Sequence, residues 1–193
     1  MVRALPKFTP TTALVTVNLV VYVYTSVVGG NFIEPFRTND YLLLLLGQKN
    51  ALTINGYYWQ LLTSMFIHIH IVHLFGNMLF LLIFGFRAEE LFSTEEYFLI
   101  YFMSGLSGNL LTLLMPLNTV SAGASGAIFG TFGACVIYLR KTFGQSIMSA
   151  LIYSFFLLMI TAGINVNILA HLGGLVAGLT IGYALAKSRK IVF

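Results

Sequence analysis

A serine between glycines, Ser125 in GASGAIFGTFGA (residues 123–134), is the side chain of this sequence best suited to nucleophilic chemistry. A hydroxyl becomes a nucleophile when a base takes its proton, and the imidazole of His171, in AHLGGLVAGL, can act as that base. The flanking glycines leave the backbone N–H of Ser125 accessible at the start of a predicted helix, where unpaired donors and the helix dipole favour an anion. Attack on an amide carbonyl creates such an anion, so these groups are candidates for nucleophile, base and oxyanion donor.

The composition is that of an integral membrane protein. Of its 193 residues, 58% are hydrophobic and 8% are charged, whereas soluble domains carry about 25% charged residues. The mean hydropathy is +0.90. We predict an all-α bundle of six transmembrane helices that forms one domain over residues 1–193, with the first apolar run retained as a helix. The predicted spans are Thr11–Gly30, His70–Leu91, Glu96–Met115, Ala124–Arg140, Ser146–Gly163 and Ile168–Lys187.

The basic residues are distributed unevenly between the two sides of this predicted bundle. With the N-terminus inside, the outer segments carry only Arg37 and Lys49, and the other eight of the ten Lys and Arg residues lie inside. The positive-inside rule therefore predicts that both termini are cytoplasmic. The long outer loop, about 31–69, contains YLLLLLGQKN, which is too short to span and is predicted to lie at the interface. The net charge of +4 is not a nucleic-acid signal, and no nucleic-acid partner is predicted.

The predicted orientation places four polar side chains in one layer. The second, fourth and sixth spans run parallel, so His73 and Asn77 share a depth with Ser125 and His171. Polar residues at such depth are costly and usually face an interior cavity. Ser125 alone would more often be a small packing residue, and His171 alone a hydrogen-bonding helix residue. Together, at matched depth, they favour a catalytic pair.

Small residues at four-residue spacing predict that two of these spans pack closely. Gly126 and Gly130 have this spacing in the fourth span, and Gly174, Gly178 and Gly182 have it in the sixth. Such spacing lets helix backbones approach within a membrane. We therefore expect the fourth and sixth spans to pack together and to bring the serine within reach of the histidine.

The histidines of HIHIVH invite a metal interpretation, which we do not favour. His70 and His73 could share a helical face, but His68 would point differently. The sequence has no His-Glu-x-x-His motif, and Glu89 and Glu90 are predicted toward the other membrane face. We predict no metal and no cofactor; a metal-dependent membrane enzyme is the alternative that a chelator would reveal.

A serine enzyme on this chain would use a Ser-His dyad. Asp40 is the only aspartate, which excludes a protease built on two aspartates and leaves no buried Asp for a triad. Burial disfavours an imidazolium, so His171 is expected to be neutral and able to accept a proton. His73 and Asn77, four residues apart on one helical face, can both donate hydrogen bonds to an oxyanion.

With these residues assembled, the chain resembles the rhomboid family of intramembrane serine proteases over essentially its whole length. The matching pieces are HLFGN (residues 73–77), GASG (residues 123–126) and AHLGGLVAGL (residues 170–179), in the family's order and spacing. The resemblance implies that Ser125 is the nucleophile and His171 the general base. It also implies the supporting roles: an oxyanion hole of His73, Asn77 and the Ser125 N–H, glycines at Gly123 and Gly126, Phe129 stacked on the base, and Glu89 as a buried structural glutamate.

Two positions depart from the family pattern. The outer loop has Trp59 followed by Gln60 where family members often have Trp-Arg, which puts the anchoring of the loop in doubt rather than catalysis. Ser93 occupies the last position of a Gly-x-x-x-Glu-x-x-x-Gly pattern, a small change. The fifth span, with Tyr153, Phe155 and Phe156, resembles the mobile element of this family that admits substrate laterally, although apolar lipid-facing residues would look the same.

By resemblance, the substrate is a transmembrane protein, cleaved in or near the outer part of its transmembrane segment. A backbone satisfied within its own helix cannot present an extended scissile bond, so the substrate must unwind locally. The expected location is the plasma membrane of a prokaryote, as a multi-pass protein within the lipid bilayer. The alternatives are a catalytically silent rhomboid-like membrane chaperone, which should lack Ser125 or His171, and a small transporter, which gives no reason for this pair.

Overall fold

The computed structural model describes residues 9–28, 36–146, 148–149, 152 and 166–189, and these are mostly helical. Five long helices dominate: α1 (Pro10–Val23), α5 (Ile71–Leu91), α6 (Thr94–Thr112), α7 (Ser125–Thr142) and α9 (Ile168–Ser188). Helix α1 continues into a π-helical segment, η1 (Tyr24–Val28). The shorter elements are α2 (Asp40–Leu46), β1 (Gln48–Lys49), α3 (Asn50–Ile54), α4 (Gln60–Thr63), the 3-10 turn η2 (Ser64–Phe66) and β2 (Val120–Ser121).

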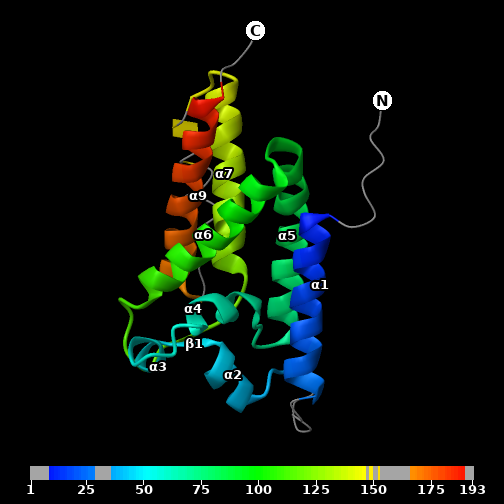
Figure 1. Ribbon diagram of the computed structural model, residues 1–193, viewed down its shortest axis with the longest axis vertical. Coiled ribbons are helices and arrows are strands. Elements are labelled where there is room, and N and C mark those ends of the chain that lie inside the picture. The colour runs from blue at the N-terminus through cyan, green and yellow to red at the C-terminus, as the bar shows by residue number, and fades with distance from the viewer. Residues whose placement is uncertain (1–8, 29–35, 147, 150–151, 153–165, 190–193) are drawn as a thin grey trace.

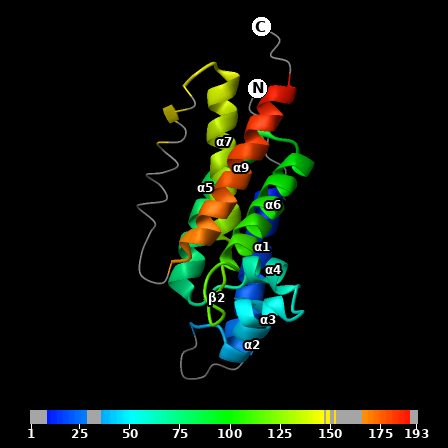
Figure 2. The same ribbon diagram turned by 90° about the vertical axis from the view of Figure 1, so that its left-hand side faces the viewer.

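The long helices form a bundle with the short elements gathered at one end. Helices α7 and α9 lie side by side in both views (Figures 1 and 2), and α1 packs beside α5 (Figure 1). Helices α5, α7 and α9 all begin at the end where the short elements collect, so they run parallel as the sequence predicts (Figure 1). There β1 pairs antiparallel with β2, which joins the loop before α3 to the loop before α7.

Within the described part of the chain, three helical segments are long and apolar enough to cross a membrane: Pro10–Val27, Ile71–Leu91 and Ile168–Ser188. Six spans are expected from the sequence. Helices α6 and α7 correspond to the third and fourth, but serines, glycines and the charged residues near one end of each lower their hydropathy. Most of the fifth predicted span, including Tyr153, Phe155 and Phe156, lies outside the described residues.

The helix boundaries differ from the predicted spans by a few residues, for reasons of capping. Helix α6 begins earlier than expected because Ser93 and Glu96 form a reciprocal capping box at its start. Helix α5 begins one residue later, because His70 is its N-cap and accepts a hydrogen bond from the backbone N–H of His73. Helix α7 starts at Ser125 itself and continues through Thr142.

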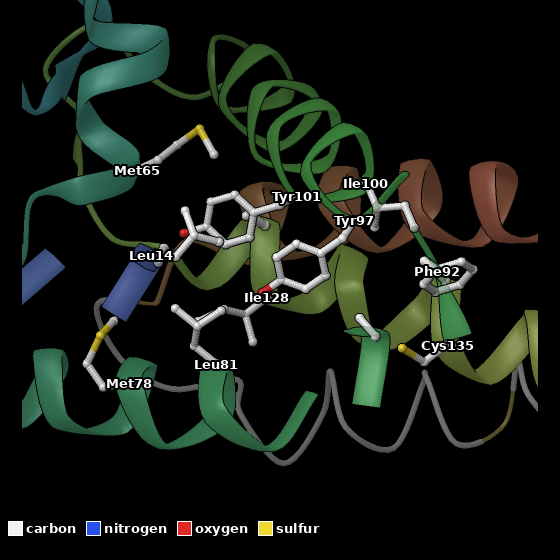
Figure 3. Close-up of a cluster of buried hydrophobic side chains, with 14 of the residues drawn as sticks. Leu14, Met65, Met78, Leu81, Phe92, Tyr97, Ile100, Tyr101, Ile128 and Cys135 are labelled. Carbon is white, nitrogen blue, oxygen red and sulfur yellow. The ribbon is translucent and has the colours of Figure 1, made fainter. Parts of the chain in front are cut away.

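The core lies where α1, α5, α6 and α7 meet. Leu14, Leu81, Tyr97, Ile100 and Ile128 are almost entirely buried there and point toward one another (Figure 3). Aromatic and branched side chains fill this region, so the four helices are held by side-chain packing. Helix α9 adds Ile181, Leu185 and Ala186 to this core and also meets α7 through glycines.

The backbones of α7 and α9 are in direct contact, as the glycine spacing predicts. A Cβ placed on Gly174 would overlap the backbone of Gly126, and one on Gly178 would overlap the backbone of Gly130. No side chain larger than hydrogen fits at either position without moving a helix. This contact sets the separation between the helix that carries the serine and the helix that carries the histidine.

Gln60 anchors the loop that the sequence predicts to be the outer one, at the position where the sequence departs from the Trp-Arg pattern of the family it resembles. The side chain of Gln60 is completely buried. Its amide donates to the carbonyls of Leu44 (2.8 Å) and of the next residue (3.3 Å), and its oxygen accepts from the Lys49 N–H (3.1 Å) and the Thr53 hydroxyl (2.8 Å). A neutral side chain thus satisfies buried polar groups from three parts of the loop.

Candidate active site

Ser125 and His171 are brought together by α7 and α9. The hydroxyl oxygen of Ser125 lies 2.8 Å from Nε2 of His171. Ser125 is the first residue of α7, and His171 is in the first turn of α9, so both side chains project at the end of the bundle where the outer loop packs. The distance is that of a hydrogen bond between a hydroxyl and an imidazole nitrogen.

The segment before Ser125 contains a glycine, Gly123, with a positive φ. Gly123 has a φ of 129°, which a residue with a side chain rarely adopts. Its N–H donates to the carbonyl of Ser64 (2.9 Å), which fixes the approach to α7 on the outer loop. A Cβ at this position would also lie 2.8–2.9 Å from the imidazole of His73. The conformation and the space both require glycine here.

The imidazole of His171 is buried and packed on one face. The ring of Phe129, one turn into α7, stacks on it with centroids 4.3 Å apart and planes inclined by 18°. Its second nitrogen, Nδ1, has no hydrogen-bond partner among the described residues. Among the described residues no carboxylate accepts a hydrogen bond from this imidazole, so Ser125 and His171 form a pair and not a triad.

His73 and Asn77 of α5 contribute to the same site. Both line a cavity that Ser125 and His171 also line. The imidazole of His73 lies against Gly123, and the Asn77 amide nitrogen is 3.9 Å from the Cβ position of that glycine. One Asn77 proton is donated to the carbonyl of His73 (2.9 Å), which leaves the second available.

The cavity has a volume of about 460 Å³. Apolar side chains from α5, α7 and the outer loop form much of its wall, and a few polar groups converge within it. The polar residues are His70, His73, Asn77, Asn109, Ser121, Ser125, Asn167 and His171. An apolar pocket with a few convergent polar groups is the usual form of a site that binds an organic ligand.

The other two histidines of HIHIVH have different environments. His68 is fully buried, its ring lies 5.2 Å from that of His73, and burial lowers its pKa to about 3, with His73 adding to the fall. The nearby backbone of Phe66 partly opposes this lowering of the pKa. Neither ring nitrogen of His68 makes a hydrogen bond among the described residues. His70 is exposed and caps α5. Over the described ranges, no three His, Cys, Asp or Glu side chains gather as a metal would need.

Glu89 lies near the opposite end of α5 from His73 and Asn77. Its carboxylate accepts the backbone N–H of Thr11 at 2.7 Å, at the start of α1. The Thr11 hydroxyl lies 3.2 Å from the hydroxyl of Tyr97. A carboxylate at a helix N-terminus satisfies an unpaired donor and complements the dipole. Glu89 therefore joins α1 to α5, at a distance from the serine and the histidine.

Asn167 lines the site but is not among the residues predicted from the sequence. It is the N-cap of α9, lines the cavity and uses all of its amide hydrogen-bonding groups. An Asn just before the apolar run of a helix is a known N-cap signal, so the capping role of Asn167 is predictable from the sequence. Its hydrogen bonds to residues far away in the sequence are not predictable in this way.

Comparison with known proteins identifies the family. The family model of the Rhomboid domain matches residues 55–188. The chain is similar to RHOMBOID-like protein 6, mitochondrial, of Arabidopsis thaliana (38% identical over 133 residues; 66% of this chain, 43% of that protein). It is also similar to Rhomboid-like protease 3 of Toxoplasma gondii (31% over 176 residues; 85% and 64%) and to Rhomboid protease GluP of Bacillus subtilis (34% over 166 residues; 81% and 32%).

The aligned part spans from about a third to about two thirds of the length of these three relatives. The matched domain covers more than half of this chain and contains every residue of the site described above. Together with the apolar helices, the match shows that the protein is an integral membrane protein. The chain belongs to the rhomboid family.

Proposed function

We propose that this protein is an intramembrane serine protease that uses Ser125 as nucleophile and His171 as general base. The observation that carries the proposal is the 2.8 Å separation of the two side chains inside the cavity. Membership of a family whose relatives include named rhomboid proteases supports the reaction class.

In the proposed reaction, the Ser125 oxygen attacks the carbonyl carbon of a peptide bond while Nε2 of His171 takes the hydroxyl proton. The tetrahedral intermediate collapses, the C–N bond breaks, and His171 returns the proton to the leaving amine. Water then attacks the acyl-enzyme with His171 again acting as base, and this releases the carboxylic acid and restores the serine. For Nε2 to accept, the imidazole proton resides on Nδ1.

The negative charge of the intermediate needs donors that are already in place. We assign this role to the side chains of His73 and Asn77 and to the backbone N–H of Ser125. His73 packs against the glycine that precedes α7, and Asn77 has one amide proton uncommitted. Ser125 is the first residue of its helix, where the N–H has no partner within the helix. Gly123 and Gly126 support this geometry, and Phe129 supports the base.

The substrate we propose is a transmembrane protein, cut in or near the outer part of its membrane segment. The cavity is lined by residues from the first turns of α5, α7 and α9 and by Met65 and Ile69 of the outer loop, and its mostly apolar wall suits an unwound segment of such a protein. We further propose that residues 1–193 form one rhomboid protease domain with six spans, with both termini cytoplasmic and the plasma membrane of a prokaryote as host. The uneven distribution of basic residues supports this orientation.

The test is cleavage of a model transmembrane substrate by protein reconstituted into liposomes. Wild type, Ser125→Ala and His171→Ala are compared at equal amounts of folded protein, with and without a chelator. We expect cleavage only by wild type and no effect of the chelator. Cleavage by Ser125→Ala at the wild-type rate would contradict the proposal, and loss of wild-type cleavage with the chelator would favour a metal-dependent enzyme.

A further inference from the structure

We propose that Asn167 is a positioning residue for His171: its side chain holds the first turn of α9 against α6 and against the strand that leads to Ser125. This inference rests on the proposed function and deepens it, because it names what keeps the base at the nucleophile. Asn167 does not touch the reacting atoms of that mechanism, so its effect is exerted through the helix that it caps.

The side chain of Asn167 makes three hydrogen bonds, each to a different element. Its oxygen accepts the N–H of Ala170 at 3.0 Å, which caps α9. Its nitrogen donates to the hydroxyl oxygens of Thr112, at the end of α6, and of Ser121, in β2, both at 2.8 Å. The Thr112 proton is itself donated to the carbonyl of Gly108 (2.9 Å), so the Thr112 oxygen is free to accept.

These bonds connect the two halves of the dyad by a short route. Ser121 lies four residues before Ser125, on the segment that passes through Gly123. Asn167 lies four residues before His171, and its carbonyl accepts the His171 N–H at 3.2 Å. Only one helical turn separates Asn167 from His171, so a displacement of Asn167 moves the base relative to the nucleophile.

The packing of α9 explains why such a tether is needed. The carbonyl of Ala170 would lie 3.1 Å from a Cβ on Gly126 and would clash with one on Gly108, so the first turn of α9 is seated between α6 and α7. Glycine contacts fix how closely the helices approach. The apolar contacts of Ile168, Leu175 and Leu179 near this end of α9 are not directional. The two hydrogen bonds from Asn167 to α6 and β2 add a directional restraint on rotation and sliding of α9.

The variant that isolates this role is Asn167→Ser. Serine is an effective N-cap, so it retains the bond to the Ala170 N–H, but it is too short to reach Thr112 and Ser121. The matched control is Asn50→Ser, the same substitution at a second Asn whose side chain ties two elements together and which is fully buried. The Asn50 amide donates only to carbonyls at and just after the end of α6, those of Thr112, Met115 and Pro116.

Two readouts are compared at a temperature well below the melting temperature of every variant. They are kcat and KM for a model transmembrane substrate, and the rate at which a fluorophosphonate labels Ser125. A misplacement of about 1 Å can cost about 10²-fold in rate. We expect Asn167→Ser to lower kcat and the labelling rate together by about 10- to 100-fold with little change in KM. Asn50→Ser should lower the melting temperature but retain the wild-type labelling rate.

The double variant Thr112→Val/Ser121→Ala removes the two acceptors and leaves Asn167 in place. It should reproduce the loss seen in Asn167→Ser, and combining all three substitutions should add little, because they remove the same bonds. Asn167→Ser that labels at the wild-type rate, or that slows no more than Asn50→Ser, overturns the inference and leaves the proposed function standing. If the Ser125→Ala variant is labelled by the fluorophosphonate at the wild-type rate, the proposed function is overturned, and this inference with it.

Discussion

Gly178 of α9 lies so close to the backbone of Gly130 in α7 that a Cβ at Gly178 would overlap it. One turn earlier on each helix, Gly174 and Gly126 stand in the same relation. The Ser125–His171 pair lies at the end of this row of contacts. The closeness of two helix backbones thus determines whether two side chains can exchange a proton.

Replacement of Gly178 by valine is expected to force α9 away from α7. We expect a loss of about 3 kcal/mol in the free energy of unfolding, because overpacking against backbone cannot be relieved by a side-chain rotation, and a fall in protease activity. Thermal unfolding in detergent measures the first effect. Ala184→Val, which creates the same residue at an exposed position of α9, is the control and should change stability little. Equal melting temperatures for the two variants would contradict the packing account.

Removal of the ring that stacks on His171 should slow catalysis more than it weakens substrate binding. Phe129→Ala is expected to lower kcat by about tenfold, because an aromatic contact of this kind is worth about 1 kcal/mol and a cation over the ring face gains further. Phe132→Ala, on the same helix and packed against Phe84, is the matched control. A drop of the same size in both variants would indicate a general packing effect instead.

Gln60 should be essential to the outer loop although it carries no charge. Gln60→Met keeps the volume of the side chain and leaves buried donors and acceptors without partners, so we expect a loss of about 2–4 kcal/mol in the free energy of unfolding. Thermal unfolding in detergent provides the measurement. Asn55→Ala, at an exposed position of the same loop, should cost less than about 0.5 kcal/mol. An unchanged melting temperature for Gln60→Met would refute the anchoring role.

The buried ring of His68 should make the protein less stable in acid. Burial lowers its pKa to about 3 from 6.5, so the folded protein keeps it neutral while the unfolded chain takes up a proton below about pH 6.5. As the pH decreases from about 6.5 toward about 3, this residue alone lowers the free energy of unfolding by about 1.4 kcal/mol for each pH unit. Above pH 7 the effect vanishes. Melting temperatures of wild type and His68→Gln between pH 8 and pH 5 should diverge only below about 6.5; parallel curves would count against it.

The proximity of Ser125 and His171 could be predicted from the sequence better than the hydrogen bonds around them. Ser125 and His171 stood out because polar residues are rare in spans, and the glycine spacing predicted the contact between α7 and α9. The bonds from Asn167 and from Gln60 escaped prediction, because they join residues far apart in sequence and follow no helical period. The sequence puts the anchoring of the loop in doubt, because Gln60 stands where the family pattern often has arginine. The burial of His68 depends on the outer loop folding over α5, which no local pattern encodes.

The central claim is that His171 activates Ser125. Its most direct test is to treat the purified protein in detergent with a fluorophosphonate and to locate the adduct by mass spectrometry of peptides. We predict a single adduct on Ser125 in wild type, none in Ser125→Ala, and labelling slowed by about 10³-fold or more in folded His171→Ala. An adduct on another serine, or labelling of Ser125 at the same rate without the His171 imidazole, would contradict the account.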